Sequence, residues 1–249
     1  MVKLIIRACR VAKVVQPGDR LFSLLRQLPK LKNRDVVAVS SKVIGILERR
    51  LVRKRDVKTK DDLIKAEADA YLPRGAWGRL TRKFSALSLA AGIDEFGEWF
   101  VLLPKNPDKS AMKIRNFLKG RNHLHELGVI ITDSHTVPLR RGKLGYALGY
   151  AGFNPLRSYW GRKNVSGRIM VHTLANLADA LSSAAVLAMG EGGERAPAAV
   201  IAGLPKDIFT KSNMTVPYSA FHVPARDDIF APLLTSRSWK EKRKQKNRR

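Results

Sequence analysis

The sequence contains little cysteine, few acidic residues and no long apolar run. A single cysteine, Cys9, among 249 residues excludes an intramolecular disulfide and a cysteine-ligated zinc site, and it favours a reducing compartment. No apolar stretch reaches the roughly 18 residues that a membrane-spanning helix needs, so we expect no membrane association. The apolar run near the N-terminus is too short for the core of a signal peptide, which predicts a cytoplasmic protein.

Common catalytic motifs are also missing. The sequence has no GK[ST] phosphate-binding loop, no GxGxxG after a predicted strand, no HExxH and no GxSxG. His123 and His125 are two residues apart on a predicted helix, so they point in different directions and are expected to be surface residues rather than a metal pair. Any active site must therefore be found from carboxylates, hydroxyls and cations.

Positive charge is in large excess. There are 47 Lys and Arg against 21 Asp and Glu, a net charge of +26. Such a balance favours polyanionic partners, namely nucleic acid, nucleotides or acidic metabolites, although a general basic bias explains it equally well. Residues 237–249 contribute +7 of this charge and have no apolar periodicity. We therefore expect a catalytic domain over 1–236 and a disordered basic tail that contacts nucleic acid nonspecifically.

The hydrophobic pattern predicts a mixture of strands and helices. Composition is that of an ordinary globular protein, with 45% hydrophobic and 27% charged residues. Because the elements lack regular βαβ spacing, the pattern favours an α+β fold with mixed sheets and packed helices over a doubly wound sheet. The expected strands are 1–7, 35–40, 85–91, 99–103, 129–132, 143–151 and 198–202, and the expected helices are 19–28, 60–71, 110–127 (ended by Gly128) and 173–189.

The strongest candidate site is Asp133 and Ser134, which follow a buried apolar strand. Open sheets commonly bind ligands at such strand ends, although capping of a turn explains an Asp-Ser pair as well. From Ser134 to residue 178 there are seven basic residues and no acid. One carboxylate at the head of a cationic stretch is the arrangement expected where a divalent metal and phosphates share a site.

Three further segments carry weaker signals. Asp94 stands at a strand-to-turn junction, and the loop 190–194 (GEGGE) carries acids after a helix, where a helix-ending glycine loop is the commoner explanation. Magnesium takes a few carboxylates together with phosphate and water oxygens, so separated acids can converge on one cation. Ser40, Ser41 and Lys42 follow a strand and offer two hydroxyls and a cation to a phosphate, or a helix N-cap.

Taken in order, these segments resemble the coenzyme F-420 gamma-glutamyl ligase family, including bacterial relatives assigned to folate metabolism. The resemblance covers nearly the whole chain except the basic tail, and ITDS, RRG and GYALG within 128–152 are its most specific part. The matching segments are DVVAVSSKVIGILERRLV (35–52), AAGIDE (90–95), KSAMKIRNFL (109–118), GVIITDSHTVPLRRGKLGYALGYAG (128–152), YWGRKNVSGR (159–168), LADALSSAAVLAMGEGGERAPAAVIAG (177–203) and DDIFAPLL (227–234).

The resemblance implies a nucleotide-driven amide ligation by an intertwined homodimer. A nucleoside triphosphate, GTP or ATP, phosphorylates the carboxylate of a polyanionic acceptor, and the amino group of L-glutamate then attacks the acyl phosphate. The implied acceptor is a coenzyme F-420 precursor or folyl-glutamate. The implied ligands of Mg or Mn are Asp94, Asp133, Ser134 and Glu191.

The same resemblance, with the cationic stretch, gives the remaining site predictions. Asp94, Asp133 and Arg141 are the expected catalytic residues. The expected nucleotide-binding residues are Ser40, Ser41, Lys42, Ser134, Arg140, Gly190, Gly192 and Gly193. Four positions depart from the family pattern, namely Ile46, Gly97, Asn164 and Ala180. The competing hypothesis is a catalytically degenerate relative that binds nucleic acid through its basic surface.

Overall fold

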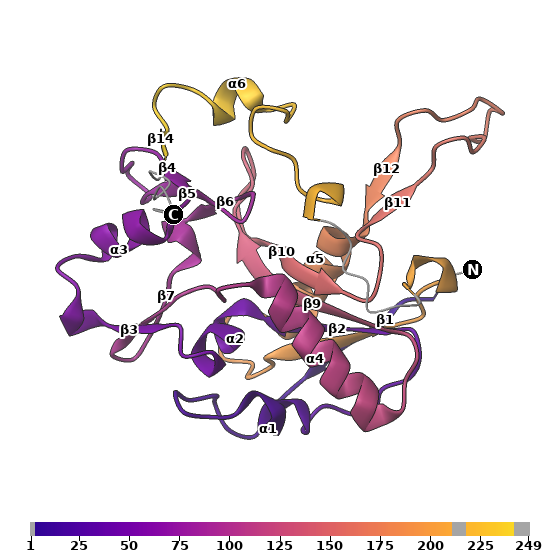
Figure 1. Cartoon of the computed structure of the whole chain (residues 1–249), viewed down its shortest axis with the longest axis horizontal. Coiled ribbons are helices and arrows are strands. Elements are labelled where there is room, and N and C mark those ends of the chain that lie inside the picture. The colour runs from indigo at the N-terminus through magenta and orange to yellow at the C-terminus, as the bar shows by residue number, and fades with distance from the viewer. Residues whose placement is uncertain (1–2, 211–217, 242–249) are drawn as a thin grey trace, which may run out of the picture.

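A mixed five-stranded sheet forms the centre of the computed structural model, which describes residues 3–210 and 218–241. The strand order is β1-β13-β2-β9-β10, in which β2 and β9 run parallel and every other neighbouring pair is antiparallel (Figure 1). This mixed sheet confirms the α+β prediction. The bounds are β1 Ile5–Cys9, β13 Ala198–Ala202, β2 Asp35–Ser40, β9 Leu127–His135 and β10 Leu144–Ala151.

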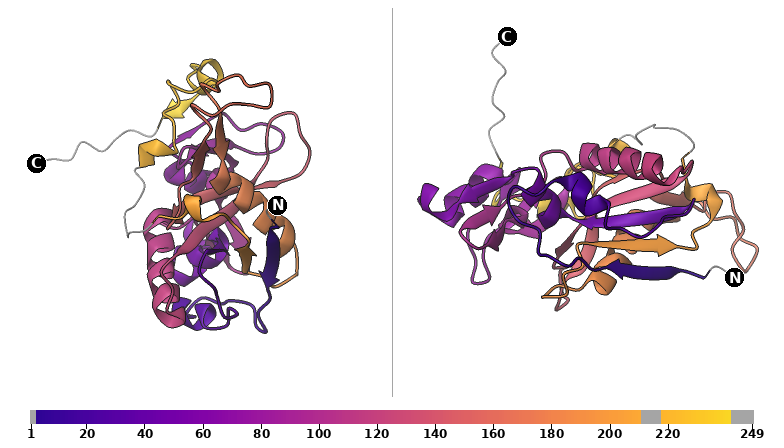
Figure 2. Two further views of the ribbon diagram at one scale, coloured as in Figure 1. Left: turned by 90° about the vertical axis from the view of Figure 1, so that its right-hand side faces the viewer. Right: turned by 90° about the horizontal axis from the view of Figure 1, so that it is seen from below.

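One long helix covers each face of this sheet. Helix α4 (Pro107–Asn122) packs on the face that includes Val37 and Val39, whereas α5 (Leu177–Met189) packs on the face of Val36 and Ala38. Because both faces are covered, β2 consists of a continuous apolar run rather than an alternating one. Figure 2 shows the sheet edge-on between its helices.

All four predicted helices have different bounds in the structure. The helix expected over 19–28 is only the short α1 (Leu21–Leu25), with Arg20 rather than Asp19 at its N-cap. The helix expected over 110–127 starts earlier, at Pro107, and ends at His123, whose left-handed φ of 53° stops it. Consequently His123 and His125 are not on a helix, and Gly128 lies inside β9 instead of ending α4. The helix expected over 173–189 begins later because Asn176 caps it by accepting from the Asp179 N–H.

The fourth difference lies in a smaller lobe formed by residues 51–101, on the left of Figure 1. Helix α3 (Lys60–Glu67) ends before the expected Tyr71, which belongs to a strand. The lobe has its own apolar core, which includes Ile64, Ile93 and Phe100. Its two sheets are β3-β8-β7 (Leu51–Arg53, Trp99–Val101, Asp94–Phe96) and β14-β4-β5-β6 (Lys240–Glu241, Ala70–Tyr71, Leu80–Lys83, Ala86–Leu89).

Short helices and a projecting arm complete the described chain. Strands β11 (Leu156–Ser158) and β12 (Leu174–Asn176) pair and form the base of an arm that extends away from the sheet in Figure 1. The short helices are α1 Leu21–Leu25, α2 Ser41–Leu47, α6 Ala231–Leu234, and the 3-10 turns Lys54–Asp56, Ala90–Gly92, Lys206–Ile208 and Tyr218–Ala220. Within the described residues, no helix is both long and apolar enough to span a membrane.

The first residues of the predicted basic tail are attached to the small lobe. Lys240 and Glu241 form β14, which pairs with β4, and the Trp239 indole donates to the Leu233 carbonyl at 2.9 Å. The Arg82 guanidinium lies 5.7 Å from the centre of the Trp239 ring and pairs with Glu241. The folded part of the chain therefore continues past residue 237, and the rest of the predicted tail, 242–249, lies outside the described residues.

Candidate active site

Strand pairing brings the predicted site segments to one edge of the central sheet. Because β2 and β9 are parallel and in register, with Ser40 opposite Thr132, their carboxyl ends lie side by side. The antiparallel neighbours place the start of β13, the end of β1 and the start of β10 at the same edge. The sheet topology, not sequence proximity, thus joins segments that are far apart in the chain.

A pocket of about 520 Å³ opens at this edge, a volume within the range of small-molecule sites. Of the predicted site residues, Ser40, Lys42, Asp94, Asp133, Ser134, Gly190, Glu191 and Gly192 line it. Apolar side chains also line the pocket, and we call them the apolar wall: Val11, Val15, Val43, Ile46 and Phe96. The pocket therefore combines carboxylates and hydroxyls with apolar surface.

Asp133 is the carboxylate most strongly affected by its surroundings. Burial raises its pKa to about 7, and the nearby negative charge of Asp94 adds to this shift. The Ser134 N–H donates to Asp133 Oδ1 at 2.9 Å, and the Ser41 hydroxyl donates to the same carboxyl group. Lys143 opposes the shift through its positive charge. Two neighbouring carboxylates in a partly buried pocket form an environment that a bound cation would stabilise.

Asp94 reaches the pocket from the small lobe. It follows a left-handed turn in which Ala90, Ala91 and Gly92 have φ values of 55°, 53° and 68°. A non-glycine residue in this region is strained, and the Thr81 hydroxyl holds the turn by accepting from the Ala91 N–H at 2.9 Å. Lys42 Nζ lies 3.1 Å from Asp94 Oδ2 across the pocket mouth. The site therefore lies between the two lobes.

The GEGGE loop approaches Asp133 from the end of α5. Gly190 ends the helix with φ 80°, and a Cβ there would lie only 2.3 Å from the Glu194 carboxylate carbon, so the close approach of Glu194 requires glycine. Glu194 in turn accepts from the Gly192 N–H at 2.8 Å. The Ser134 hydroxyl donates to Glu191 Oε2 at 3.1 Å. Glu191 thus lies beside the Asp-Ser pair.

Ser40 and Ser41, where β2 meets α2, do not bear out the alternative of a side-chain helix cap. Ser40 is the N-cap residue of α2, but its side chain makes no capping hydrogen bond and instead lines the pocket. Ser41 is buried beneath the pocket, where it contacts Asp133. Ile46, at a position that departs from the family pattern, is 2% exposed and contributes to the apolar wall.

Arg140, Arg141 and Gly193 are not among the residues that line the pocket. Both arginines are exposed in the β9–β10 loop, where Arg140 donates to the Leu139 carbonyl at 3.3 Å. Lys143, the last residue before β10, does line the pocket and makes no ion pair within the described part of the chain. The basic stretch after Ser134 indicated that cations lie near the site, but its composition did not show which of them lines the pocket.

Sequence reasoning also missed His135. It lies two residues after Asp133 on β9 and therefore on the same face of the strand. The alternation of side chains along a strand could have placed it beside the site from sequence alone. Its Nδ1 lies 3.1 Å from the Leu87 carbonyl of β6, and its ring centre is 4.4 Å from that of Tyr146. These contacts link the small lobe to the central sheet at the pocket.

The oxygen donors fit a hard divalent cation but are not gathered as a ready metal cluster. Among the described residues, no three His, Cys, Asp or Glu side chains lie close enough together to hold a metal ion. Asp94 is instead paired with Lys42, and Glu191 with Ser134. Carboxylate and hydroxyl oxygens are the ligands that magnesium and manganese prefer. A cation bound at Asp94 Oδ2 would replace the Lys42 ammonium there.

Comparison with known proteins identifies the family of this chain. The family model described as F420-0:Gamma-glutamyl ligase matches residues 78–203, and the chain belongs to this family. The coenzyme F420:L-glutamate ligase of Methanopyrus kandleri is 29% identical over 233 residues, covering 86% of this chain and 92% of the relative. The ligase of the same name from Archaeoglobus fulgidus is 32% identical over 213 residues, covering 77% and 84%. That from Methanothermobacter thermautotrophicus is 41% identical over 118 residues, or 46% of each chain.

Proposed function

We propose that the protein is a gamma-glutamyl ligase that joins L-glutamate to an acceptor carboxylate, at the expense of a nucleoside triphosphate. The observation that carries the proposal is the convergence of Asp94, Asp133 and Ser134 in one pocket at the sheet edge. Family membership supports the reaction class, and the relatives' names indicate a coenzyme F-420 precursor as acceptor. Folyl-glutamate is the second acceptor to test, and GTP and ATP are the candidate triphosphates.

The proposed reaction has two steps. An oxygen of the acceptor carboxylate attacks the γ-phosphorus, so that a new P–O bond forms and the nucleoside diphosphate leaves. The glutamate amine then attacks the acyl carbon, the C–N bond forms, and inorganic phosphate leaves with the electron pair of the C–O bond while the amine loses a proton to solvent. Because such reactions need little covalent help, the protein mainly positions the reactants and balances charge.

Each part of the pocket has a role in this scheme. Asp94, Asp133, Ser134 and Glu191 would hold Mg²⁺ or Mn²⁺, which neutralises phosphate charge when bound. Lys143, unpaired among the described residues, supplies positive charge to the phosphates, and Ser40 supplies a hydroxyl. The apolar wall around Val11, Val15 and Ile46 excludes water from the reacting groups.

The experiment that tests this proposal incubates the protein with Mg²⁺ or Mn²⁺, GTP or ATP, L-glutamate and one acceptor. Mass spectrometry should show an acceptor heavier by one glutamate residue, with stoichiometric diphosphate and phosphate release. Omission of metal, triphosphate or glutamate should each abolish the product. Absence of any adduct with either acceptor, together with salt-sensitive binding of nucleic acid, would favour the catalytically degenerate relative instead.

A further inference from the structure

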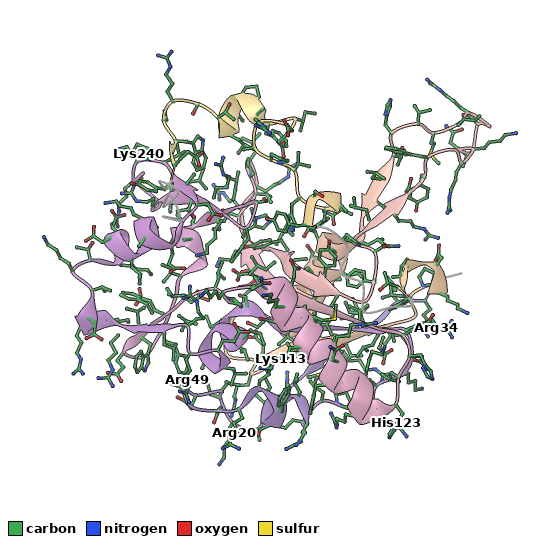
Figure 3. The ribbon with its side chains drawn as sticks, viewed as in Figure 1. Arg20, Arg34, Arg49, Lys113, His123 and Lys240 are labelled. Atoms are coloured by element: carbon green, nitrogen blue, oxygen red, sulfur yellow. The ribbon has the colours of Figure 1, made fainter. Side chains whose placement is uncertain are left out.

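One face of the molecule that the proposed reaction does not use carries six exposed cations. We call this the α1–α4 face and define it by its exposed cations Arg20, Arg26, Lys30, Lys109, Lys113 and Arg121. None of the six lines the pocket, and none forms an ion pair within residues 3–210 and 218–241. Figure 3 shows Arg20 and Lys113 on this side of the ribbon.

The described acids near the α1–α4 face form no ion pair with its cations. Asp19 accepts from the Gln16 N–H at 2.9 Å, Asp108 accepts from the Tyr150 N–H at 3.1 Å, and Glu126 pairs with Arg34. The small lobe differs, since many of its cations are paired, as Arg79 is with Asp61 at 2.7 Å. The cations of the α1–α4 face are therefore open to a polyanion, as are exposed cations elsewhere, such as Arg162, Lys163 and Arg168 of the arm.

Helix α4 carries three of these cations at exposed positions, with a half-buried aromatic ring among them. Lys109, Lys113, Phe117 and Arg121 are spaced four residues apart, so they form an inclined ridge with about 6 Å of rise and about 40° of turn per step. Phe117 stacks on Phe22 of α1, with ring centres 4.5 Å apart and planes at 23°.

Helix α1 adds a shallow hollow beside this ridge. Arg26, Phe117, Gly120 and Arg121 line it. Arg121 holds α1 against α4 by donating to the Leu25 carbonyl at 2.8 Å and the Leu28 carbonyl at 3.2 Å. The hollow therefore combines two guanidinium groups with an aromatic ring on a fixed framework.

We infer that the α1–α4 face binds single-stranded nucleic acid. A row of cations matches a phosphate backbone, and the exposed part of the Phe22 ring, close to Lys113, offers a stacking surface to a base, which is the combination typical of single-strand binding. An anionic membrane fits less well, because the half-buried Phe117 covers one side of Phe22 and little apolar surface is left to insert. This activity is separate from the pocket and from the proposed ligation.

The test measures binding of the full-length protein to a fluorescent oligo-uridine by anisotropy over a range of salt concentrations. The decisive variant is Arg26→Glu with Lys113→Glu. Its matched control is Lys58→Glu with Arg74→Glu, which makes the same charge change at exposed, unpaired cations of the small lobe. Phe22→Leu removes the stacked ring while keeping an apolar side chain. Melting temperatures verify that each variant is folded.

Arg26→Glu with Lys113→Glu should weaken binding at least tenfold and flatten the log–log salt slope by roughly 0.7 for each lost phosphate contact. The control should bind within twofold of the wild type. Phe22→Leu should weaken binding severalfold with an unchanged slope, and inorganic polyphosphate should compete less well than oligo-uridine. Equal losses in the decisive variant and its control, or tighter binding to anionic vesicles than to oligo-uridine, would overturn the inference.

Discussion

At the scale of single residues, the site depends on carboxylates whose surroundings disfavour their charged form. Asp133 is partly buried beside Asp94, and two serines provide its hydrogen bonds. The ionised Asp133 carboxylate therefore lowers the stability of the folded protein, unless a cation or a proton neutralises its charge. A substitution that removes the charge of such a residue is therefore expected to impair the site without lowering the stability of the fold.

The first prediction concerns the stability of Asp133→Asn. Because the folded state raises the pKa of Asp133 from 3.8 to about 7, the folded protein holds this proton more tightly than the unfolded chain. Wild-type stability therefore falls as pH rises from about 4 to 7, a loss that asparagine avoids. In chelator-treated protein, we expect the melting temperature of the variant relative to wild type to rise by a few degrees between pH 4.5 and pH 8. A pH-independent difference would contradict this.

The second prediction ranks the cations near the pocket. Lys143→Met should raise the KM for the triphosphate by roughly five- to a hundredfold, the effect of losing a contact between charged groups worth about 1–3 kcal/mol. Arg140→Met and Arg141→Met should have smaller effects, because both side chains are exposed outside the pocket. Initial rates at varied triphosphate concentration provide the measurement. Larger losses at Arg141 than at Lys143 would restore the assignment made from sequence alone.

At the scale of elements, the parallel pairing of β2 and β9 creates the site and the C-terminal segment stabilises the small lobe. β14 adds a strand beside β4, while Trp239 contacts both Arg82 and the Leu233 carbonyl. The tail predicted from charge alone therefore contains two kinds of residue. Trp239 to Glu241 make tertiary contacts, whereas six of the eight residues after Glu241 are basic.

The third prediction compares two truncations. Ending the chain after Glu241 should leave the melting temperature and ligation rate unchanged, since β14 and its contacts remain. Ending it after Ser236 should lower the melting temperature by several degrees, because β14, the Arg82 ion pair and the indole hydrogen bond are lost. Thermal scans of the two proteins side by side are sufficient. Indistinguishable melting temperatures would show that β14 contributes nothing to stability.

Several elements were predictable because local chemistry and tertiary packing agree. DVVAVS and AAVIA form strands at the predicted residues, since both are short apolar runs buried on two faces. Helix ends were less predictable, because Asn106 and Asn176 set the starts of α4 and α5, and the left-handed His123 ends α4. Sequence patterns do not reveal that a histidine adopts this conformation.

At the scale of the whole molecule, the pocket arises where two lobes meet. Asp94 comes from the small lobe, whereas Asp133 and Glu191 come from the edge of the central sheet. Motif resemblance could group these residues, but only the fold shows that Lys42 spans the two lobes to reach Asp94 and that the arginine loop lies outside. Long-range strand register, which no local pattern encodes, determines these relations.

The measurement that tests the central claim most directly is glutamate addition by Asp94→Asn and Asp133→Asn, with Mg²⁺ or Mn²⁺ and the triphosphate that supports wild-type activity. Each substitution keeps the side-chain size but removes a negative charge that would hold the cation beside the phosphates. The account predicts that both variants fold and bind glutamate-acceptor mixtures without forming measurable glutamate adduct. Wild-type rates of adduct formation in both variants would contradict it.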